Sequence, residues 1–173
     1  MNFAEIKKCD IANGPGVRVS LFVSGCTHHC PGCFNEIAWD FSYGNPFTAE
    51  IQKELLTALA PSYIRGLTLL GGEPLERVNQ QGLLPFLKKV KETYPEKDIW
   101  CYTGYRLEED IMGRMLEQWE ETKEMLSMID VLVDGRFEER LKDISLRFRG
   151  SSNQRLIDLK QTLQKGEVIL WDD

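Results

Sequence analysis

The sequence predicts an α/β protein on a mostly parallel sheet, folded as a partial, open barrel or as a doubly wound sheet. Short β-rich runs alternate with amphipathic helical stripes, the pattern of parallel strands joined by crossover helices. With 173 residues, the chain is shorter than the roughly 250 residues of a full eightfold barrel. Several predicted strands also end in a glycine-containing polar loop, and parallel sheets place their ligands at that edge.

The elements follow one another along the whole chain. Strands are predicted at residues 17–23, 67–70, 98–102 and 129–133, and two further runs, 145–148 and 167–171, are also expected to be strands. No repeat or linker divides the chain, so residues 1–173 are expected to form a single domain. Helices are predicted where apolar residues recur at helical spacing. These stripes are Ile51, Leu55 and Leu59, with Thr48 as the expected cap; Leu83, Phe86, Leu87 and Val90; and Leu107, Ile111, Met115 and Trp119.

Composition and charge disfavour two classes of partner. The net charge is −6 and no block of Lys or Arg stands out, whereas nucleic-acid binding needs positive charge to displace counterions from phosphates. No apolar run approaches the roughly 20 residues that a membrane span needs. The first ten residues lack the apolar stretch of a signal peptide. We therefore expect a cytoplasmic protein without a nucleic-acid or membrane partner.

Three of the five cysteines fall within eight residues, in a C-x3-C-x2-C loop formed by Cys26, Cys30 and Cys33. Fe–S clusters normally take four cysteines, so three would leave one iron open for chemistry. Zinc is the alternative, because both histidines of the chain, His28 and His29, lie inside the loop. The loop alone leaves iron and zinc open.

The other two cysteines are the remaining candidates for a fourth ligand. Cys101 lies within the predicted strand 98–102, between two aromatic residues, and such a cysteine is usually part of the core. For Cys9 the sequence leaves three roles open: a ligand, an exposed thiol or a core residue.

A second motif, Gly71-Gly72-Glu73-Pro74, follows the next predicted strand. Together with the cysteine loop it resembles the radical S-adenosylmethionine (SAM) superfamily. Residues 14–18 and 22–26 resemble the start of glycyl-radical-enzyme activases. Residues 35–39, 102–105, 133–137 and 149–155 resemble the activating proteins of anaerobic ribonucleoside-triphosphate reductase, so that the resemblance covers nearly the whole chain. One departure is Gly32, which stands where many superfamily members carry an aromatic residue beside the adenine; Phe34 or another aromatic would take that place.

The resemblance implies a radical-SAM-type partial β/α barrel with one 4Fe–4S cluster and SAM as cofactors. An outside electron donor such as flavodoxin would reduce the cluster, SAM would be cleaved, and the resulting 5′-deoxyadenosyl radical would take hydrogen from a glycine of the reductase. This chemistry needs no acid–base residue, so none is named. The implied cluster ligands are Cys26, Cys30 and Cys33, and the implied SAM contacts are Gly71, Gly72, Glu73, Pro74, Thr103 and Asp134.

Other readings stay open at this point. Asp134 is as compatible with a turn before Gly135 as with a cofactor contact. Asn153 and Arg155 would contact SAM or the partner's glycine loop, or belong to a polar surface loop. His28 and His29 are expected over the cluster without a ligand role. The alternative functions are an activase of another glycyl radical enzyme, a radical SAM enzyme acting on a small molecule, and a zinc-binding interaction module.

Overall fold

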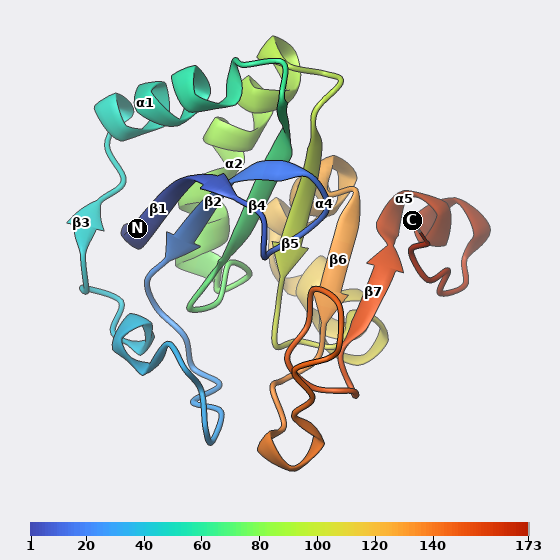
Figure 1. Cartoon of the computed structure of the whole chain (residues 1–173). Helices are drawn as coiled ribbons and strands as arrows, with labels where there is room; N and C mark the ends of the chain where they lie inside the picture. The colour runs from blue at the N-terminus through green and yellow to red at the C-terminus, as the bar shows by residue number, and fades with distance from the viewer. Residues whose placement is uncertain (173) are drawn as a thin grey trace.

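In the computed structural model, which describes residues 1–172, seven strands form one mixed sheet in the order β3-β1-β2-β4-β5-β6-β7 (Figure 1). Strands β2, β4, β5 and β6 are parallel, whereas β1, β3 and β7 pair antiparallel at the two sides. The strands are β1 (Asn2–Asp10), β2 (Val17–Val23), β3 (Asn45–Pro46), β4 (Ile64–Gly71), β5 (Asp98–Tyr102), β6 (Val131–Asp134) and β7 (Arg155–Asp158).

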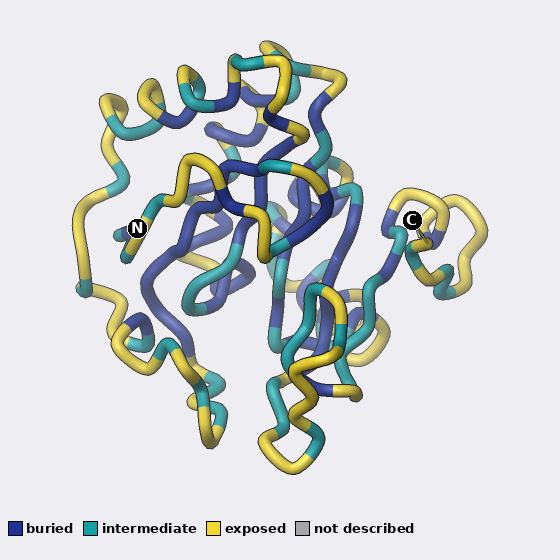
Figure 2. Tube along the Cα trace, in the orientation of Figure 1, coloured by how far each residue is buried: buried dark blue, intermediate teal, exposed yellow. Residues whose placement is uncertain are grey.

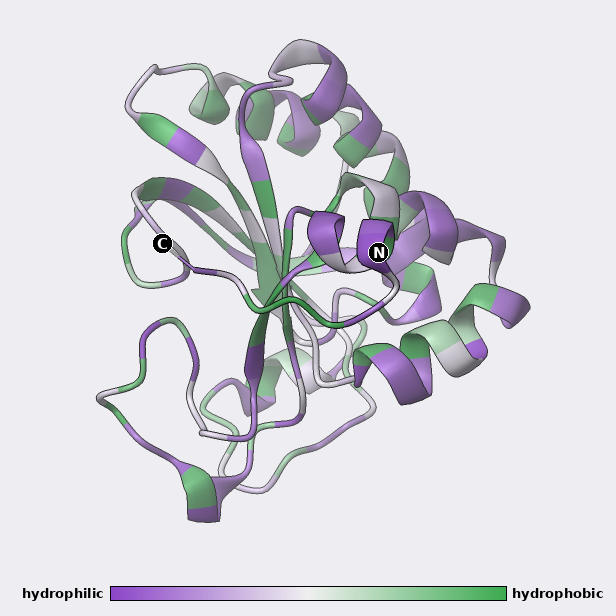
Figure 3. Cartoon of the chain, turned by 90° about the vertical axis from the view of Figure 1, so that its right-hand side faces the viewer, coloured by the Kyte–Doolittle hydropathy of each residue, from purple (hydrophilic) through white to green (hydrophobic). Residues whose placement is uncertain are grey.

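The parallel strands follow one another across the sheet without reversal, so the doubly wound alternative does not apply. Right-handed crossovers in one direction place their helices on one face, and Figures 1 and 3 show the main helices on that side of the sheet. The helices are η1 (Glu36–Trp39), α1 (Ala49–Leu59), α2 (Arg77–Thr93), η2 (Leu107–Met115), α3 (Leu116–Gln118), α4 (Glu120–Met128), η3 (Glu139–Leu141) and α5 (Leu159–Lys165).

Local sequence explains where the first helix begins and which face it buries. The side chain of Thr48 accepts a hydrogen bond from the Ile51 amide at 3.3 Å, which caps α1 as expected. Leu55 and Leu59 of its apolar stripe are fully buried. Leu83, Phe86, Leu87 and Val90 of the second predicted stripe are fully buried as well, on α2. In Figure 2 the central strands and the inner sides of the helices are buried, while the loops are mostly exposed.

Two predicted strands are wrong. Residues 145–148 form turns, because the Asp143 carboxylate accepts hydrogen bonds from the amide and hydroxyl of Ser145 and so favours a local turn over a ladder. Residues 167–171 make a single bridge, between Leu170 and Ile157, while Trp171 packs its ring against Trp100. The third helical stripe is formed, but as π-helix η2 followed by the short α3.

The sequence also left several elements unpredicted: β1, β3, β7, α4 and α5. Strand β1 carries Lys7 and Lys8 on largely exposed positions, so its composition lacks the apolar run used to find the central strands. No helix within residues 1–172 combines the length and the apolar character that crossing a membrane requires.

Candidate functional site

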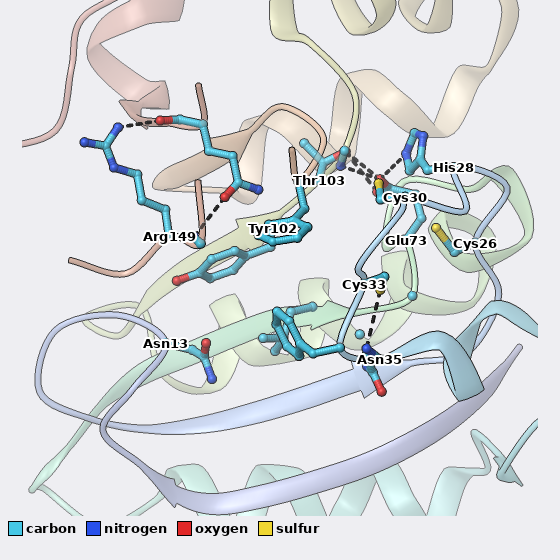
Figure 4. A pocket seen from close by; sticks show the side chains of 18 of the residues that line it. Asn13, Cys26, His28, Cys30, Cys33, Asn35, Glu73, Tyr102, Thr103 and Arg149 are labelled. Carbon is cyan, nitrogen blue, oxygen red and sulfur yellow. Dashed lines mark hydrogen bonds and ion pairs between the residues drawn. The ribbon is translucent and has the colours of Figure 1, made fainter. Parts of the chain in front are cut away.

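A pocket of about 360 Å³ opens at the edge of the sheet where the parallel strands end. The loops after β2, β4, β5 and β6 all contribute to its wall, as the glycine-containing strand ends predicted. Figure 4 shows the cysteines at one end of the pocket, and Asn13, Tyr102 and Arg149 at the other. The site is therefore an elongated space with a thiol-rich end and an aromatic, polar end.

The three thiols of the cysteine loop line the same pocket. Cys26 is buried, whereas Cys30 and Cys33 are partly exposed. Burial raises the pKa of Cys26 to about 11, although the amides of His28 and His29 partly oppose this. Burial raises the pKa of Cys30 as well. Because metal ligands are thiolates, binding at this loop must release protons.

The donor set fits an iron–sulfur cluster. Within residues 1–172, no three His, Cys, Asp or Glu side chains are grouped closely enough to hold a single metal ion. The thiolates of an Fe–S cluster each bind a different iron, so they need to border a shared space, and these three cysteines line one pocket. Neither remaining cysteine lines the pocket: Cys9 is exposed and Cys101 is buried in the core.

Glu73 ties the loop after β4 to the cysteine loop and to the end of β5. Its side chain is 1% exposed. One carboxylate oxygen lies 2.8 Å from His28 Nε2 and accepts the Gly104 amide at 2.7 Å, while the other accepts the Leu75 amide at 2.9 Å. The Thr103 hydroxyl lies 2.9 Å from both oxygens. A carboxylate offers about four lone-pair sites, so groups of the chain itself already occupy this one.

A second buried carboxylate, Glu76, holds the start of the same loop. One oxygen accepts the Thr27 hydroxyl at 2.6 Å and the Thr27 amide at 3.0 Å. The Tyr105 hydroxyl lies 3.4 Å from that oxygen, and the Tyr105 ring packs edge-on against His28 at a centroid distance of 4.4 Å. The residues between Cys26 and Cys30 are thus held in place by two acidic side chains, Glu73 through His28 and Glu76 through Thr27.

Close backbone packing accounts for the two glycines before Glu73. Gly71 has φ +126°, and a Cβ there would lie 2.4 Å from the Val23 carbonyl oxygen. A Cβ on Gly72 would lie 2.5 Å from the Gly25 carbonyl oxygen. Both glycines line the pocket, so the tight turn and the pocket wall are one structure.

The segment before β2 forms another part of the wall, through Ala12 and Asn13. A fully buried Arg18 fixes this segment: it donates to the Pro15 carbonyl at 3.2 Å and pairs with Asp98 at 2.5 Å. Thr68 accepts from Arg18 at 2.8 Å and donates to the Asn13 carbonyl at 2.8 Å. Burial lowers the pKa of the Arg18 guanidinium, and Asp98 opposes that shift.

The structure brings most, but not all, of the predicted SAM contacts into the pocket. Gly71, Gly72, Glu73 and Thr103 line it, whereas buried Pro74 does not. Asp134 does not line it either.

The carboxylate of Asp134 is committed elsewhere. It accepts the Leu107 amide at 2.9 Å and pairs with Arg155 at 2.5 Å. Asp134 and Glu108 raise the pKa of Arg155 further above its already high value. Asp134 and Arg155 therefore join the ends of β6 and β7.

Residues 149–155 shape the wall through hydrogen bonds within the segment and to residues 135 and 136. The Gln154 side chain accepts the amides of Gly150 and Ser151 and donates to the Gly135 carbonyl at 3.0 Å. Asn153 donates to the Arg136 carbonyl at 2.8 Å. These bonds hold the segment that carries Phe137, Leu146 and Phe148 into the pocket wall.

The residues at the aromatic end were not predicted as site residues: Asn13, Phe22, Tyr102 and Phe148 all line the pocket. The Tyr102 hydroxyl donates to the Phe148 carbonyl at 2.6 Å. The available signal was that Tyr102 ends a predicted strand, directly before Thr103 and Gly104. Nothing local indicated Asn13 or Phe148.

The histidines of the loop have different surroundings. His28 is buried against Glu73 and Tyr105, and it lines the pocket. His29 has φ 50° and stacks on Trp39, with ring centroids 4.3 Å apart and planes at 11°.

Comparison with known proteins agrees with this donor set. Residues 12–157 match a family model described as a 4Fe-4S single cluster domain. The chain is 46% identical over 156 residues to the anaerobic ribonucleoside-triphosphate reductase-activating protein of Enterobacteria phage T4, with 90% of this chain and 93% of the relative covered. The proteins of the same name from Pasteurella multocida and Escherichia coli K12 are 46% and 42% identical, covering 89% of this chain and 95% and 96% of the relatives.

The match spans the features on which the site depends. The family model includes the cysteine loop, the Gly71–Pro74 turn and the loop closed by Gln154. Identity above 40% over nine-tenths of the chain is shared with relatives of almost the same length. The chain therefore belongs to the family of anaerobic ribonucleoside-triphosphate reductase-activating proteins.

Proposed function

We propose that this chain activates an anaerobic ribonucleoside-triphosphate reductase as a radical SAM enzyme, with one 4Fe–4S cluster and SAM bound in the pocket. The observation that carries the proposal is the meeting of three thiols and a double-glycine turn in one wall. When bound, the cluster and SAM supply reductive cleavage of SAM and a 5′-deoxyadenosyl radical that takes hydrogen from a glycine of the reductase. The chain itself binds and orients the cluster and SAM and shields them from side reactions.

Cys26, Cys30 and Cys33 would hold three irons and leave the fourth without a protein ligand. Buried Cys26 anchors the loop, and the partly exposed Cys30 and Cys33 extend along the pocket wall. Glu76 and Glu73 hold the loop between Cys26 and Cys30 through Thr27 and His28. A loop held in place in this way reduces the ordering that cluster binding would otherwise require.

SAM would lie along the pocket from the thiols to the aromatic end. A volume of about 360 Å³ falls in the range of small-molecule sites, which is roughly 300–1,000 Å³. Gly71 and Gly72 present backbone atoms without side chains, and Thr103 lies beside them. Since the Glu73 carboxylate is occupied by the chain's own donors, we assign it to hold the loop and Gly104 in place.

The aromatic end would receive the adenine. Phe22, Tyr102 and Phe148 supply apolar ring surface, and Asn13 and Arg149 supply polar groups. Phe34 also lines the pocket, so it offers a ring near the position where Gly32 departs from the superfamily pattern. This arrangement is that of an apolar pocket with a few polar groups that fix orientation.

Residues 1–173 would act as one radical-SAM-type domain. The sheet wound in one direction from β2 to β6, with its helices on one face, supports an open segment of a β/α barrel. The electron would come from an outside protein donor such as flavodoxin.

The test uses protein purified without oxygen and loaded with iron and sulfide. We expect 5′-deoxyadenosine after reduction with SAM, and a glycyl-radical resonance on the reductase by electron paramagnetic resonance. The Cys26→Ala, Cys30→Ala and Cys33→Ala variants should lose both signals, while Cys9→Ala, which changes an exposed thiol away from the pocket, should keep them. Absence of SAM cleavage by the wild type refutes the proposal; cleavage without a radical on the reductase favours a small-molecule substrate.

A further inference from the structure

Exposed apolar side chains gather around the pocket. Ten large apolar side chains are exposed within residues 1–172, and five of them lie in or beside segments that line the pocket. Phe41, the least exposed of these, lies against Gly25. The other four, which we term the rim residues, are Ile11, Phe34, Ile37 and Ile144, with exposed fractions of 75%, 90%, 61% and 95%.

The rim residues come from three separate segments, and each of these segments also contributes residues to the pocket wall. Ile11 directly precedes Ala12 and Asn13 of the pocket wall, and Phe34 is itself in the wall. Ile144 lies two residues before Leu146, also in the wall. Scattered apolar residues on a surface need no explanation, but a group of them around one opening marks an interaction site.

Two of these segments form projecting loops. Residues 26–41 and the first part of 136–150 extend past the end of the sheet, at the bottom of Figure 1, and much of both segments is exposed in Figure 2. The second part of 136–150 turns back over the sheet, where Phe148 packs on Trp100. The two segments meet where Gly32 faces Glu139, since a Cβ on Gly32 would lie 2.8 Å from the Glu139 carboxyl carbon. A chain that reaches the pocket from this side must pass along these loops.

The loop 136–149 also differs in charge from the rest of the molecule. It carries five Lys or Arg and three Asp or Glu, although the whole chain has a net charge of −6. Arg136, Arg140 and Lys142 are exposed on it, close in sequence to Ile144. The loop therefore favours a partner segment with acidic side chains beside apolar ones.

We propose that the rim residues and the basic loop 136–149 dock the glycine-bearing segment of the reductase, which enters in extended form with apolar and acidic side chains flanking the glycine. The proposal rests on the proposed function, because hydrogen transfer from a protein glycine requires that backbone to pass the rim. Exposed isoleucine and phenylalanine become favourable contacts once a partner covers them. Arg140 and Lys142 steer that partner and set its register.

Ile144→Ser tests the apolar part of this surface, because Ile144 lies outside the pocket wall and its exposed position leaves folding unaffected. Its matched control is Tyr63→Ser. Tyr63 is 64% exposed and directly precedes β4, so it lies at the opposite edge of the parallel strands. Two quantities are measured with iron-loaded protein: 5′-deoxyadenosine formed without the reductase, and the reductase concentration that gives half-maximal glycyl radical.

We expect Ile144→Ser to cleave SAM at the wild-type rate but to need about tenfold more reductase, as expected for losing an interface contact of moderate weight. The double variant Arg140→Glu, Lys142→Glu should raise the concentration as well and reverse its dependence on salt. Tyr63→Ser should match the wild type in both measurements. Wild-type values for both Ile144→Ser and the Arg140→Glu, Lys142→Glu double variant would overturn the docking surface while leaving the proposed function intact. A wild type that yields no radical overturns both.

Discussion

The role of Glu73 leads to the sharpest prediction, because its carboxylate joins three parts of the site. In Glu73→Gln the shape is kept, but one acceptor oxygen becomes an amide donor. If the amide replaces the oxygen that faces Leu75, the Leu75 amide loses its acceptor; in the other orientation the Gly104 amide loses it. Leaving one buried donor unsatisfied costs about 1–3 kcal/mol.

The cost of the unsatisfied amide should appear as more frequent local unfolding of the segments that Glu73 contacts. Because each 1.4 kcal/mol is about tenfold, the amides of residues 73–76 and 103–105 should exchange hydrogen about 5- to 150-fold faster in Glu73→Gln than in the wild type. Hydrogen exchange followed by mass spectrometry on the iron-loaded protein measures this segment by segment. The matched control is Glu124→Gln, since Glu124 is half-exposed in a surface ion pair with Lys88.

Unchanged exchange in both segments, with the control behaving as expected, would contradict this prediction. Such a result would mean that the Glu73 carboxylate does not hold these amides in solution and is free to meet a ligand. Faster exchange across the whole chain would also contradict it, because the predicted effect is confined to the two segments.

Three further outcomes follow from the structure. Asp98→Asn leaves the fully buried Arg18 guanidinium without its carboxylate and should lower stability by about 2–3 kcal/mol. This is at or below the roughly 3–5 kcal/mol for a broken buried pair, because Asp98 is partly exposed. The thermal unfolding midpoint should fall by about 4–12 °C, and a shift as small as that of Glu124→Gln would contradict this. Gly71→Ala should lower stability by at least about 1–3 kcal/mol, because φ +126° is strained for alanine and its Cβ would meet a carbonyl oxygen; a stable variant would disprove the close approach. Burial raises the pKa of Tyr105 to about 12, above its unfolded value of about 10. The contribution of protonated Tyr105 to stability is therefore complete below about pH 10 and is lost as pH rises toward 12. Tyr105→Phe should reduce the loss of stability at alkaline pH, and an unchanged loss would refute the pKa shift.

The elements that could be predicted are those whose residues carry their signal locally. The central strands are apolar runs, and α1 and α2 have both an apolar stripe and clear ends. Strand β1 was not predicted, because an antiparallel strand beside a two-residue neighbour tolerates charged side chains such as Lys7 and Lys8. Residues 145–148 were wrongly predicted as a strand, because the Asp143 carboxylate bonds Ser145 and favours a local turn despite the β-like composition.

The site divides in the same way. The cysteine loop and the double glycine could be recognised as site residues from the sequence alone. The structure brings Cys26, Cys30 and Cys33 into the wall that Gly71 and Gly72 also form. The partners of polar residues could not be read from the chain, because they depend on contacts between distant segments. Asp134 was expected at the cofactor, yet Arg155, 21 residues away, takes its carboxylate.

The hydrogen bonds of Gln154 have a consequence for the order in which the protein is made. The last wall of the pocket is fixed only when Gln154 can reach Gly135 and Gly150, about 120 residues after Cys33 leaves the ribosome. At about 5–20 residues per second, that is a delay of roughly 6–24 s. During this interval the pocket lacks the wall that Gln154 holds, and the thiols of the cysteine loop are open to the surrounding solution on that side. Timing of translation therefore sets a period in which the nascent chain depends on its surroundings to keep those thiols reduced.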